Sequence, residues 1–173
     1  MLIVLDILNF LEIHVMKVIH KNATLAKTLM GVAALALSGS VFAQIQLPTP
    51  LTIPGGKVIS AEDGHKLADK KAAFFVDTRN AVNFGKGHVP GATVISYKGD
   101  SADVPEFDAT KDKFDLTKLP TAKDKALVFY SDGPTGWKSY KAAVWAIKDG
   151  YKNVNYMRPG WSEWQAKGFA AEN

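Results

Sequence analysis

The stretch Ala126–Gly150, ALVFYSDGPTGWKSYKAAVWAIKDG, decides the fold, because it predicts a buried strand, a glycine-rich loop and a helix in direct succession. Residues 126–130 are a short apolar run of β-forming side chains, and Gly133, Pro134 and Gly136 follow before helical spacing begins. In an open parallel sheet such a loop lies at the carboxyl edge of the strands, where ligands bind. The N–H groups that open a helix have no partner inside it, so this loop is a candidate site for an anion.

Strands and helices alternate on both sides of this stretch. Short apolar runs predict further strands over residues 57–60, 72–76, 93–96 and 154–157. Helical patterns predict helices from Ser60, as the N-cap, to about Lys70, over 80–84 and over 162–167. The alternation predicts an α/β domain of three layers around a mostly parallel sheet.

Two stretches lie outside this alternation. Residues 44–56 contain three prolines and end in a glycine pair, which predicts an extended lead-in to the domain. Residues 97–124 are rich in charge and include Pro105 and Pro120. We predict that they form a surface excursion with one short helix near 114–119.

The first 43 residues have the features of a secretory signal peptide. Lysines precede an apolar run, Leu29–Leu37, and small residues end at Ala43. We predict a signal peptide over 16–43, a start-site extension over 1–15 and a folded domain over 57–169. The alternative is a membrane anchor, which needs about 20 apolar residues, and this run is shorter. The predicted location is the periplasm or the exterior, with no stable membrane anchor after cleavage.

Composition excludes several classes of function. The net charge of +4 is too mild to predict a nucleic-acid partner. The chain has no cysteine, which excludes thiol catalysis, CxxC redox chemistry and thioether haem attachment. His65 and His88 are the histidines of the predicted domain, too few for a zinc site of the usual Cys/His kind. No metal or cofactor is predicted.

Several landmarks recur in one order along the chain, and together they resemble a rhodanese domain over residues 57–169. They are Asp77-Thr78-Arg79 after a strand, Gly87-His88-Val89-Pro90-Gly91-Ala92, the loop that ends in Lys138-Ser139, Gly150-Tyr151-Lys152-Asn153-Val154 and Pro159-Gly160-Trp161. The resemblance implies a parallel five-stranded α/β domain whose active site is the loop after the fourth strand. Asp77 and Arg79 are expected to form a structural ion pair rather than to contact ligand.

In active members of that family the loop begins with a cysteine, which carries sulfur as a persulfide between donor and acceptor. Ser131 occupies the matching position here, and its hydroxyl oxygen cannot hold sulfane sulfur. Gly136 is a second position where a close relative could carry cysteine, and Lys138 stands where many relatives have arginine. The resemblance therefore implies a member of the sulfurtransferase family with no catalytic residue in place.

The predicted ligand is a small sulfur or phosphorus oxyanion, or a protein partner, held by the loop. The candidate binding residues are Ser131, Asp132, Gly133, Thr135, Gly136, Trp137, Lys138 and Ser139. For Lys138 and Ser139, the alternative role is capping of the following helix. Ser131 as a hydrolase nucleophile is the weaker alternative, because Gly133 fits the nucleophile-elbow pattern but Phe129 does not.

Three functions stay open on the sequence. The first is a secreted, non-catalytic binding module of this family. The second is an active thiosulfate-type sulfurtransferase that works by a route the sequence does not reveal. The third is a purely structural interaction module that uses residues 97–124 as its contact surface.

Overall fold

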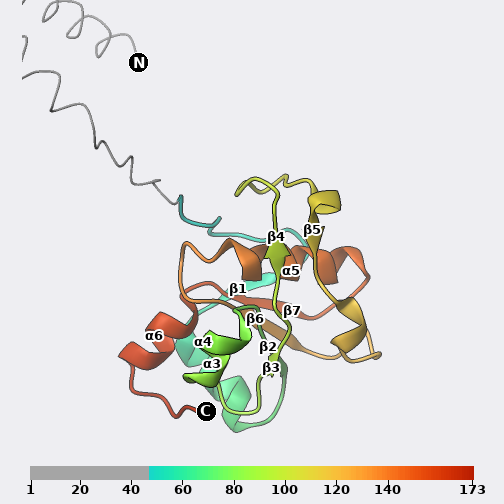
Figure 1. Cartoon of the computed structure of the whole chain (residues 1–173). Helices are drawn as coiled ribbons and strands as arrows, with labels where there is room; N and C mark the ends of the chain where they lie inside the picture. The colour runs from blue at the N-terminus through green and yellow to red at the C-terminus, as the bar shows by residue number, and fades with distance from the viewer. Residues whose placement is uncertain (1–46) are drawn as a thin grey trace, which may run out of the picture. The chain divides into compact units, whose positions relative to one another are not determined.

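The computed structural model describes residues 47–173, so the predicted start-site extension and signal peptide lie outside the described residues. A parallel sheet of five strands forms the centre of the domain (Figure 1), in the order β1-β7-β6-β2-β3. The strands are β1 (Lys57–Ile59), β2 (Phe74–Asp77), β3 (Thr93–Val94), β6 (Leu127–Tyr130) and β7 (Val154–Met157). The predicted three-layer α/β fold with a five-stranded parallel sheet is confirmed.

Helices cover both faces of this sheet. Helix α5 (Trp137–Lys148) packs on one face, and α3 (Ala61–Asp69) and α6 (Gly160–Ala166) pack on the other. Successive residues of a strand point to opposite faces, so Leu127 and Phe129 join the α5 core while Val128 joins the α3–α6 core. A short helix, α4 (Ala81–Gly85), follows β2. Because the central strand β6 is buried on both faces, its sequence is a continuous apolar run.

The N-cap predicted for the first helix of the domain is present. The Ser60 hydroxyl accepts a hydrogen bond from the Asp63 N–H at 3.1 Å, which satisfies one of the free N–H groups at the start of α3. Asn80 caps α4 in the same way, through its side-chain oxygen and the Asn83 N–H at 2.8 Å. Local capping chemistry therefore fixes where both helices begin.

The segment 97–124 is more ordered than a surface excursion. Its strands β4 (Lys98–Gly99) and β5 (Asp112–Lys113) pair antiparallel, and it contains two 3-10 turns, η1 (Ala109–Lys111) and η2 (Leu116–Lys118). The helix predicted near 114–119 is only the turn η2. Four large hydrophobic side chains of the segment are buried in the domain: Tyr97, Phe107, Phe114 and Leu119. The segment therefore adds a wall to the α5 side of the domain.

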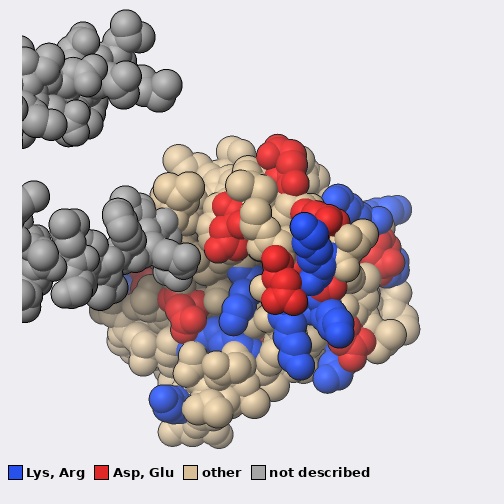
Figure 2. Space-filling view, turned by 45° about the horizontal axis from the view of Figure 1, so that its top comes forward, with Lys and Arg blue, Asp and Glu red and all other residues tan. Residues whose placement is uncertain are grey.

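Charges of both signs are interspersed on the face shown in Figure 2, where Lys and Arg side chains lie next to Asp and Glu. Within residues 47–173, no helix is long and apolar enough to cross a membrane.

Candidate functional site

The loop between β6 and α5 lines a cavity of about 350 Å³ at the carboxyl end of β6. Six of the eight predicted site residues line it: Ser131, Asp132, Thr135, Gly136, Trp137 and Lys138. The opposite wall was not predicted; its residues are Tyr97, Gly99 and Asp103 from the 97–124 segment and Lys141 from α5. The structure thus brings most of the predicted loop to one cavity and adds a second side from a distant segment.

The other two predicted residues support the loop from outside the cavity. Ser139 is buried, and its hydroxyl donates to the Gly136 carbonyl at 3.0 Å at the start of α5. Gly133 lies next to α6, where a Cβ added to it would lie 2.9 Å from the Ser162 Oγ. Lys138 is exposed at the second position of α5 and is available to a ligand.

Ser131 is only 3% exposed and lies at the closed end of the loop. A Cβ at position 136 would lie 2.8 Å from the Ser131 Cβ and 2.9 Å from the Gly133 carbonyl oxygen, so the loop needs glycine there to fold over Ser131. Ser131 therefore lies on the cavity lining with most of its surface covered by the loop.

His88 is not placed to activate Ser131 as a nucleophile. Its ring stacks on Phe84 at a centroid distance of 3.6 Å, and its Nδ1 lies 3.0 Å from the Phe84 carbonyl oxygen. The other ring nitrogen, Nε2, lies 3.8 Å from a Glu172 carboxylate oxygen. The two nitrogens face groups in α4 and in the carboxy-terminal tail, so the geometry gives no support to a serine hydrolase.

Helix α6 holds the first two carbonyl groups of the loop. The N–H groups of Trp161 and Ser162 donate to the carbonyls of Ser131 and Asp132, both at 2.8 Å. This close approach depends on Gly160, whose φ is +63° and at which a Cβ would lie 2.4 Å from the Ser131 carbonyl oxygen. The start of α6 therefore fixes the path of the chain around Ser131.

The lead-in holds the other end of the loop. Thr49 is 2% exposed, and both its N–H and its hydroxyl donate to the Pro134 carbonyl at 2.8 Å. The hydroxyl also lies 2.7 Å from the Tyr156 hydroxyl of β7. Two residues before Thr49, the Leu47 carbonyl accepts a hydrogen bond from Trp137 Nε1 at 2.8 Å. The extended conformation was predicted, but its contact with the loop was not.

We expect Thr49→Val to lower the free energy of unfolding by about 1–2 kcal/mol, because it leaves the hydroxyl of Tyr156 and one lone pair of Pro134 without a partner. Urea unfolding measures the loss, and hydrogen exchange at the Gly136 and Trp137 amides reports whether the loop opens more often. Thr52→Val is the control, since Thr52 is exposed. Equal stability and exchange in the two variants would contradict a supporting role for Thr49.

A buried ion pair lies at the carboxyl end of β2. Arg79 is 3% exposed and Asp77 is 0% exposed, with Nη2 and Oδ2 separated by 2.6 Å. The same Nη2 donates to the Gly87 carbonyl at 2.7 Å, and the guanidinium lies 5.1 Å from the Trp161 ring. Burial alone would lower the pKa of Arg79, but the hydrogen bonds and charge of Asp77 outweigh it and raise the pKa. The predicted structural ion pair is confirmed.

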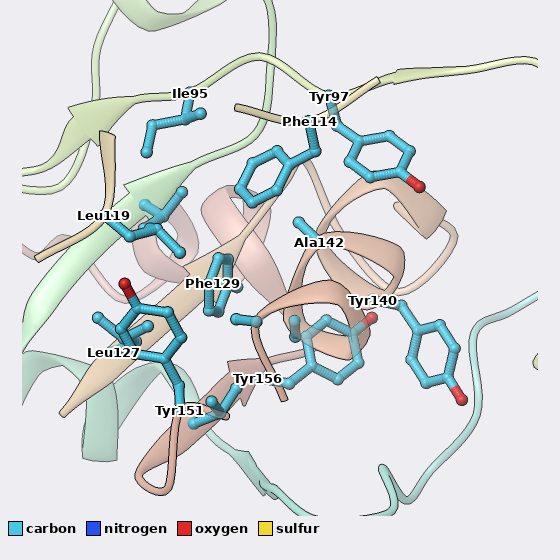
Figure 3. Close-up of a cluster of buried hydrophobic side chains, with 14 of the residues drawn as sticks. Ile95, Tyr97, Phe114, Leu119, Leu127, Phe129, Tyr140, Ala142, Tyr151 and Tyr156 are labelled. Atoms are coloured by element: carbon cyan, nitrogen blue, oxygen red, sulfur yellow. The ribbon is translucent and has the colours of Figure 1, made fainter. Parts of the chain in front are cut away.

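Asp112 organises the opposite wall of the cavity. Its Oδ2 accepts hydrogen bonds from the hydroxyls of Tyr97 and Ser101, both at 2.6 Å. Its Oδ1 accepts from the N–H groups of Asp100 and Ser101, both at 2.9 Å. Figure 3 shows how Tyr97 and Phe114 of this segment extend the apolar cluster formed with Tyr140 and Ala142 of α5. The segment that forms this wall is therefore held by hydrogen bonds to the Asp112 carboxylate and by packing of its aromatic side chains in the core.

Asp112 is expected to make the domain less stable at acid pH. Burial raises the pKa of this carboxyl group, but the hydrogen bonds from Ser101 and Tyr97 outweigh burial and lower the pKa below its ordinary value. A lowered pKa in the folded state means that the stabilisation is complete above about pH 4 and is lost as the pH falls further. The Asp112 carboxylate in turn raises the pKa of Tyr97, in addition to burial.

We expect Asp112→Asn to lower the free energy of unfolding by about 1–3 kcal/mol at pH 7, because charged hydrogen bonds are replaced by neutral ones. Below about pH 4 the difference from wild type narrows, since protonation removes the same charge from wild type. Urea unfolding at a series of pH values measures both effects. A difference that stays constant down to about pH 2 would contradict the assignment to Asp112.

Across residues 47–173 there is no group of three or more His, Asp or Glu side chains placed to hold a metal ion. The polar groups that face the cavity are the Ser131 and Thr135 side chains, the amino end of α5 and the charged side chains at positions 103, 132, 138 and 141. This set offers hydrogen bonds and charge to a small polar ligand.

The family of rhodanese-like domains has a sequence model that matches residues 60–167, which is more than half of the chain. Curated relatives include two proteins named tRNA uridine(34) hydroxylase. The one from Sodalis glossinidius is 31% identical over 105 residues, and the one from Erwinia tasmaniensis is 29% identical over 107 residues. Each match covers 61% of this chain and 27% of the relative, so the chain spans about a quarter of their length.

Solved structures show the same fold at low sequence identity. The BH2092 protein from Bacillus halodurans has a TM-score of 0.52 and 21% identity, over 68% of this chain and 77% of that chain. A thiosulfate sulfurtransferase from Pseudomonas aeruginosa has a TM-score of 0.51 and 17% identity, over 68% of this chain and 20% of that chain. Together with the family match, these structures establish the fold on which the loop is placed.

Proposed function

Because this chain belongs to the family of rhodanese-like domains, we propose that it is a binding module of that family, which holds a small oxyanion in the cavity of the β6–α5 loop and transfers no sulfur. One observation carries the proposal. The loop lines a cavity of about 350 Å³, while a serine on that lining occupies the position of the family's cysteine.

The missing thiol argues against sulfur transfer. A persulfide intermediate needs a thiolate that forms, and later releases, a sulfur–sulfur bond. The chain has no cysteine at any position, so no neighbouring side chain replaces Ser131 in this role. The groups of the loop that can interact with a negative group, the amino end of α5 and Lys138, are still in place.

Two features favour a small sulfur or phosphorus oxyanion as the ligand. The cavity is lined by the first residues of α5, a helix of 12 residues whose amino end carries partial positive charge. The exposed ammonium group of Lys138 lies on the same lining. A protein partner could bind in the same way, by presenting a group of this kind to the loop.

Export is part of the proposal. The pattern of residues 16–43 supports a signal peptide and a periplasmic or secreted location. Amino-terminal sequencing of protein recovered from the periplasm or the medium is expected to begin near Gln44. Recovery of the uncleaved chain in the cytoplasm would contradict export without affecting the assignment of the cavity.

RNA is not part of the proposal, although the curated relatives are named for an activity on tRNA. That name describes proteins of which this chain spans about a quarter. The net charge of +4 and the interspersed charges of Figure 2 give no extended basic surface on the face shown there.

Calorimetry tests anion binding directly. We expect the domain to release or absorb heat with at least one of sulfite, sulfate, thiosulfate and phosphate, and we expect Lys138→Ala to weaken that binding about fivefold or more. Lys148→Ala is the matched control, because Lys148 is an exposed lysine at the other end of the same helix. No heat with any of the four anions would overturn the oxyanion proposal.

An assay of sulfur transfer separates the proposal from an active enzyme. Wild type is expected to form no thiocyanate from thiosulfate and cyanide, whereas Ser131→Cys is expected to gain turnover, because the new thiol stands in the family's position within an intact loop. Thiocyanate formation by wild type would establish the alternative, an active sulfurtransferase. A folded but inactive Ser131→Cys would indicate that the loop no longer supports the family's chemistry.

A further inference from the structure

We infer that the cavity selects an organic anion with a single negative charge and an apolar substituent over an inorganic dianion, and that Asp132 is the selecting residue. The inference rests on the proposed function, because it names the class of anion that the same cavity takes. It follows from three properties of the lining: its charge balance, the position of Asp132 and the chemistry of its aromatic side chains.

The charges on the lining are balanced rather than positive. Two carboxylates, Asp103 and Asp132, and two ammonium groups, Lys138 and Lys141, line the cavity. Lys141 is 3% exposed, and its Nζ already binds the Asp103 carboxylate at 2.9 Å and the Ser101 carbonyl at 3.0 Å. The charge of Lys141 is therefore compensated inside the protein. Lys138 is left as the cation that a ligand meets.

Asp132 opposes a second negative charge on the ligand. It follows Ser131 in the loop, and its side chain is 69% exposed. Its nearest cation, Arg79 Nη1, lies 3.9 Å away, and that guanidinium already binds the buried carboxylate of Asp77. The charge of Asp132 is therefore only partly compensated. Asp132 on the same lining would repel the second charge of a dianion, whereas a monoanion needs only the one pairing with Lys138.

The aromatic lining offers carbon rather than hydrogen bonds. The Tyr97 hydroxyl is bound to Asp112 at 2.6 Å, and Trp137 Nε1 is bound to the Leu47 carbonyl at 2.8 Å. Both residues line the cavity with their polar side-chain atoms occupied elsewhere, and the small part of them that stays exposed, 2% for Tyr97 and 6% for Trp137, offers no further side-chain hydrogen bond. A volume of about 350 Å³ lies at the lower end of the range of about 300–1,000 Å³ found for cavities that hold organic ligands. An apolar substituent would cover the rings and fill space that a bare oxyanion leaves empty.

Two matched pairs of anions test the inference by calorimetry at constant ionic strength: methanesulfonate against sulfate, and methanethiosulfonate against thiosulfate. Within each pair the tetrahedral sulfur is kept and a methyl group replaces one charged oxygen. We expect wild type to bind the monoanion of each pair about tenfold more tightly than the dianion, because one repulsion is removed and one apolar contact is gained.

The variant Asp132→Asn tests whether Asp132 is the residue that makes the cavity prefer monoanions to dianions. We expect this variant to bind sulfate and thiosulfate several-fold more tightly than wild type does, which narrows the ratio of monoanion affinity to dianion affinity within each pair. Asp124 is an exposed aspartate outside the cavity lining, and we expect Asp124→Asn to leave that ratio unchanged. Thermal unfolding confirms that both variants are folded. Dianions that bind wild type as tightly as the monoanions, or an unchanged ratio in Asp132→Asn, would overturn the inference and leave the proposed function standing. No binding of any of the four anions would overturn both.

Discussion

Replacing Asp77 by asparagine is expected to lower the free energy of unfolding by about 3–5 kcal/mol, because it leaves the guanidinium of Arg79 buried without its counter-ion. Arg79 is 3% exposed and donates to both carboxylate oxygens of Asp77. Asparagine keeps the size of the side chain and removes the charge, so the loss reports the ion pair rather than a cavity. Urea unfolding at pH 7 measures it.

Lys66→Ala is the control for this prediction. Lys66 also pairs with an aspartate, Asp63, at 3.1 Å, but the two side chains are 69% and 55% exposed. An exposed pair of this kind contributes less than about 1 kcal/mol. If Asp77→Asn cost no more than Lys66→Ala, the end of β2 would not depend on the buried ion pair.

The second large effect is expected from Gly160→Ala. A Cβ at this position would lie 2.4 Å from the Ser131 carbonyl oxygen, and the φ of +63° adds strain for any residue with a side chain. We expect a loss of about 3 kcal/mol or more in the free energy of unfolding, since the strain is joined by loss of the hydrogen bonds from α6 to the loop. Anion binding is expected to fall with it, because the loop must move away from α6.

Gly91→Ala separates these two causes. Gly91 has a similar φ of +72°, but a Cβ there would meet no atom within 4 Å. Its expected cost is about 1–2 kcal/mol, the conformational part alone, with no change in anion binding. Comparable losses of stability and unchanged binding in both variants would show that contact between Gly160 and Ser131 does not hold the loop.

The central strands and helices were predictable because their signals are local. The run from Leu127 to Tyr130 is buried on both faces and is apolar throughout. The N-cap at Ser60 and the first residue of α5 lie where the sequence predicts them. The loop residues of the cavity were predictable for the same reason, since they follow a strand and open a helix. Six of the eight candidate residues line the cavity, and their binding of a ligand stays a prediction.

The second wall of the cavity was not predictable, because it depends on contacts between distant residues. The residue Lys141 appears in the sequence as one more lysine on a helix, yet its ammonium group binds Asp103, 38 positions earlier. Likewise, Asp112 appears as one charge among many in 97–124, and only the pairing of β4 with β5 shows that it collects four hydrogen bonds. Short polar segments carry no periodic pattern, so their tertiary contacts leave no local signal.

The carbonyl contacts of the loop set the direction of its N–H groups. A trans peptide unit is planar, and its N–H points opposite to its C=O. The carbonyls of Ser131 and Asp132 point to α6 and that of Pro134 points to Thr49, so the N–H groups of the following residues, Asp132, Gly133 and Thr135, point away from these supports. If the loop binds an anion as proposed, backbone groups outside it contribute to that affinity. Substitutions at the start of α6 or in the lead-in are then expected to rotate peptide dipoles and change the electric field in the cavity without altering any residue that lines it.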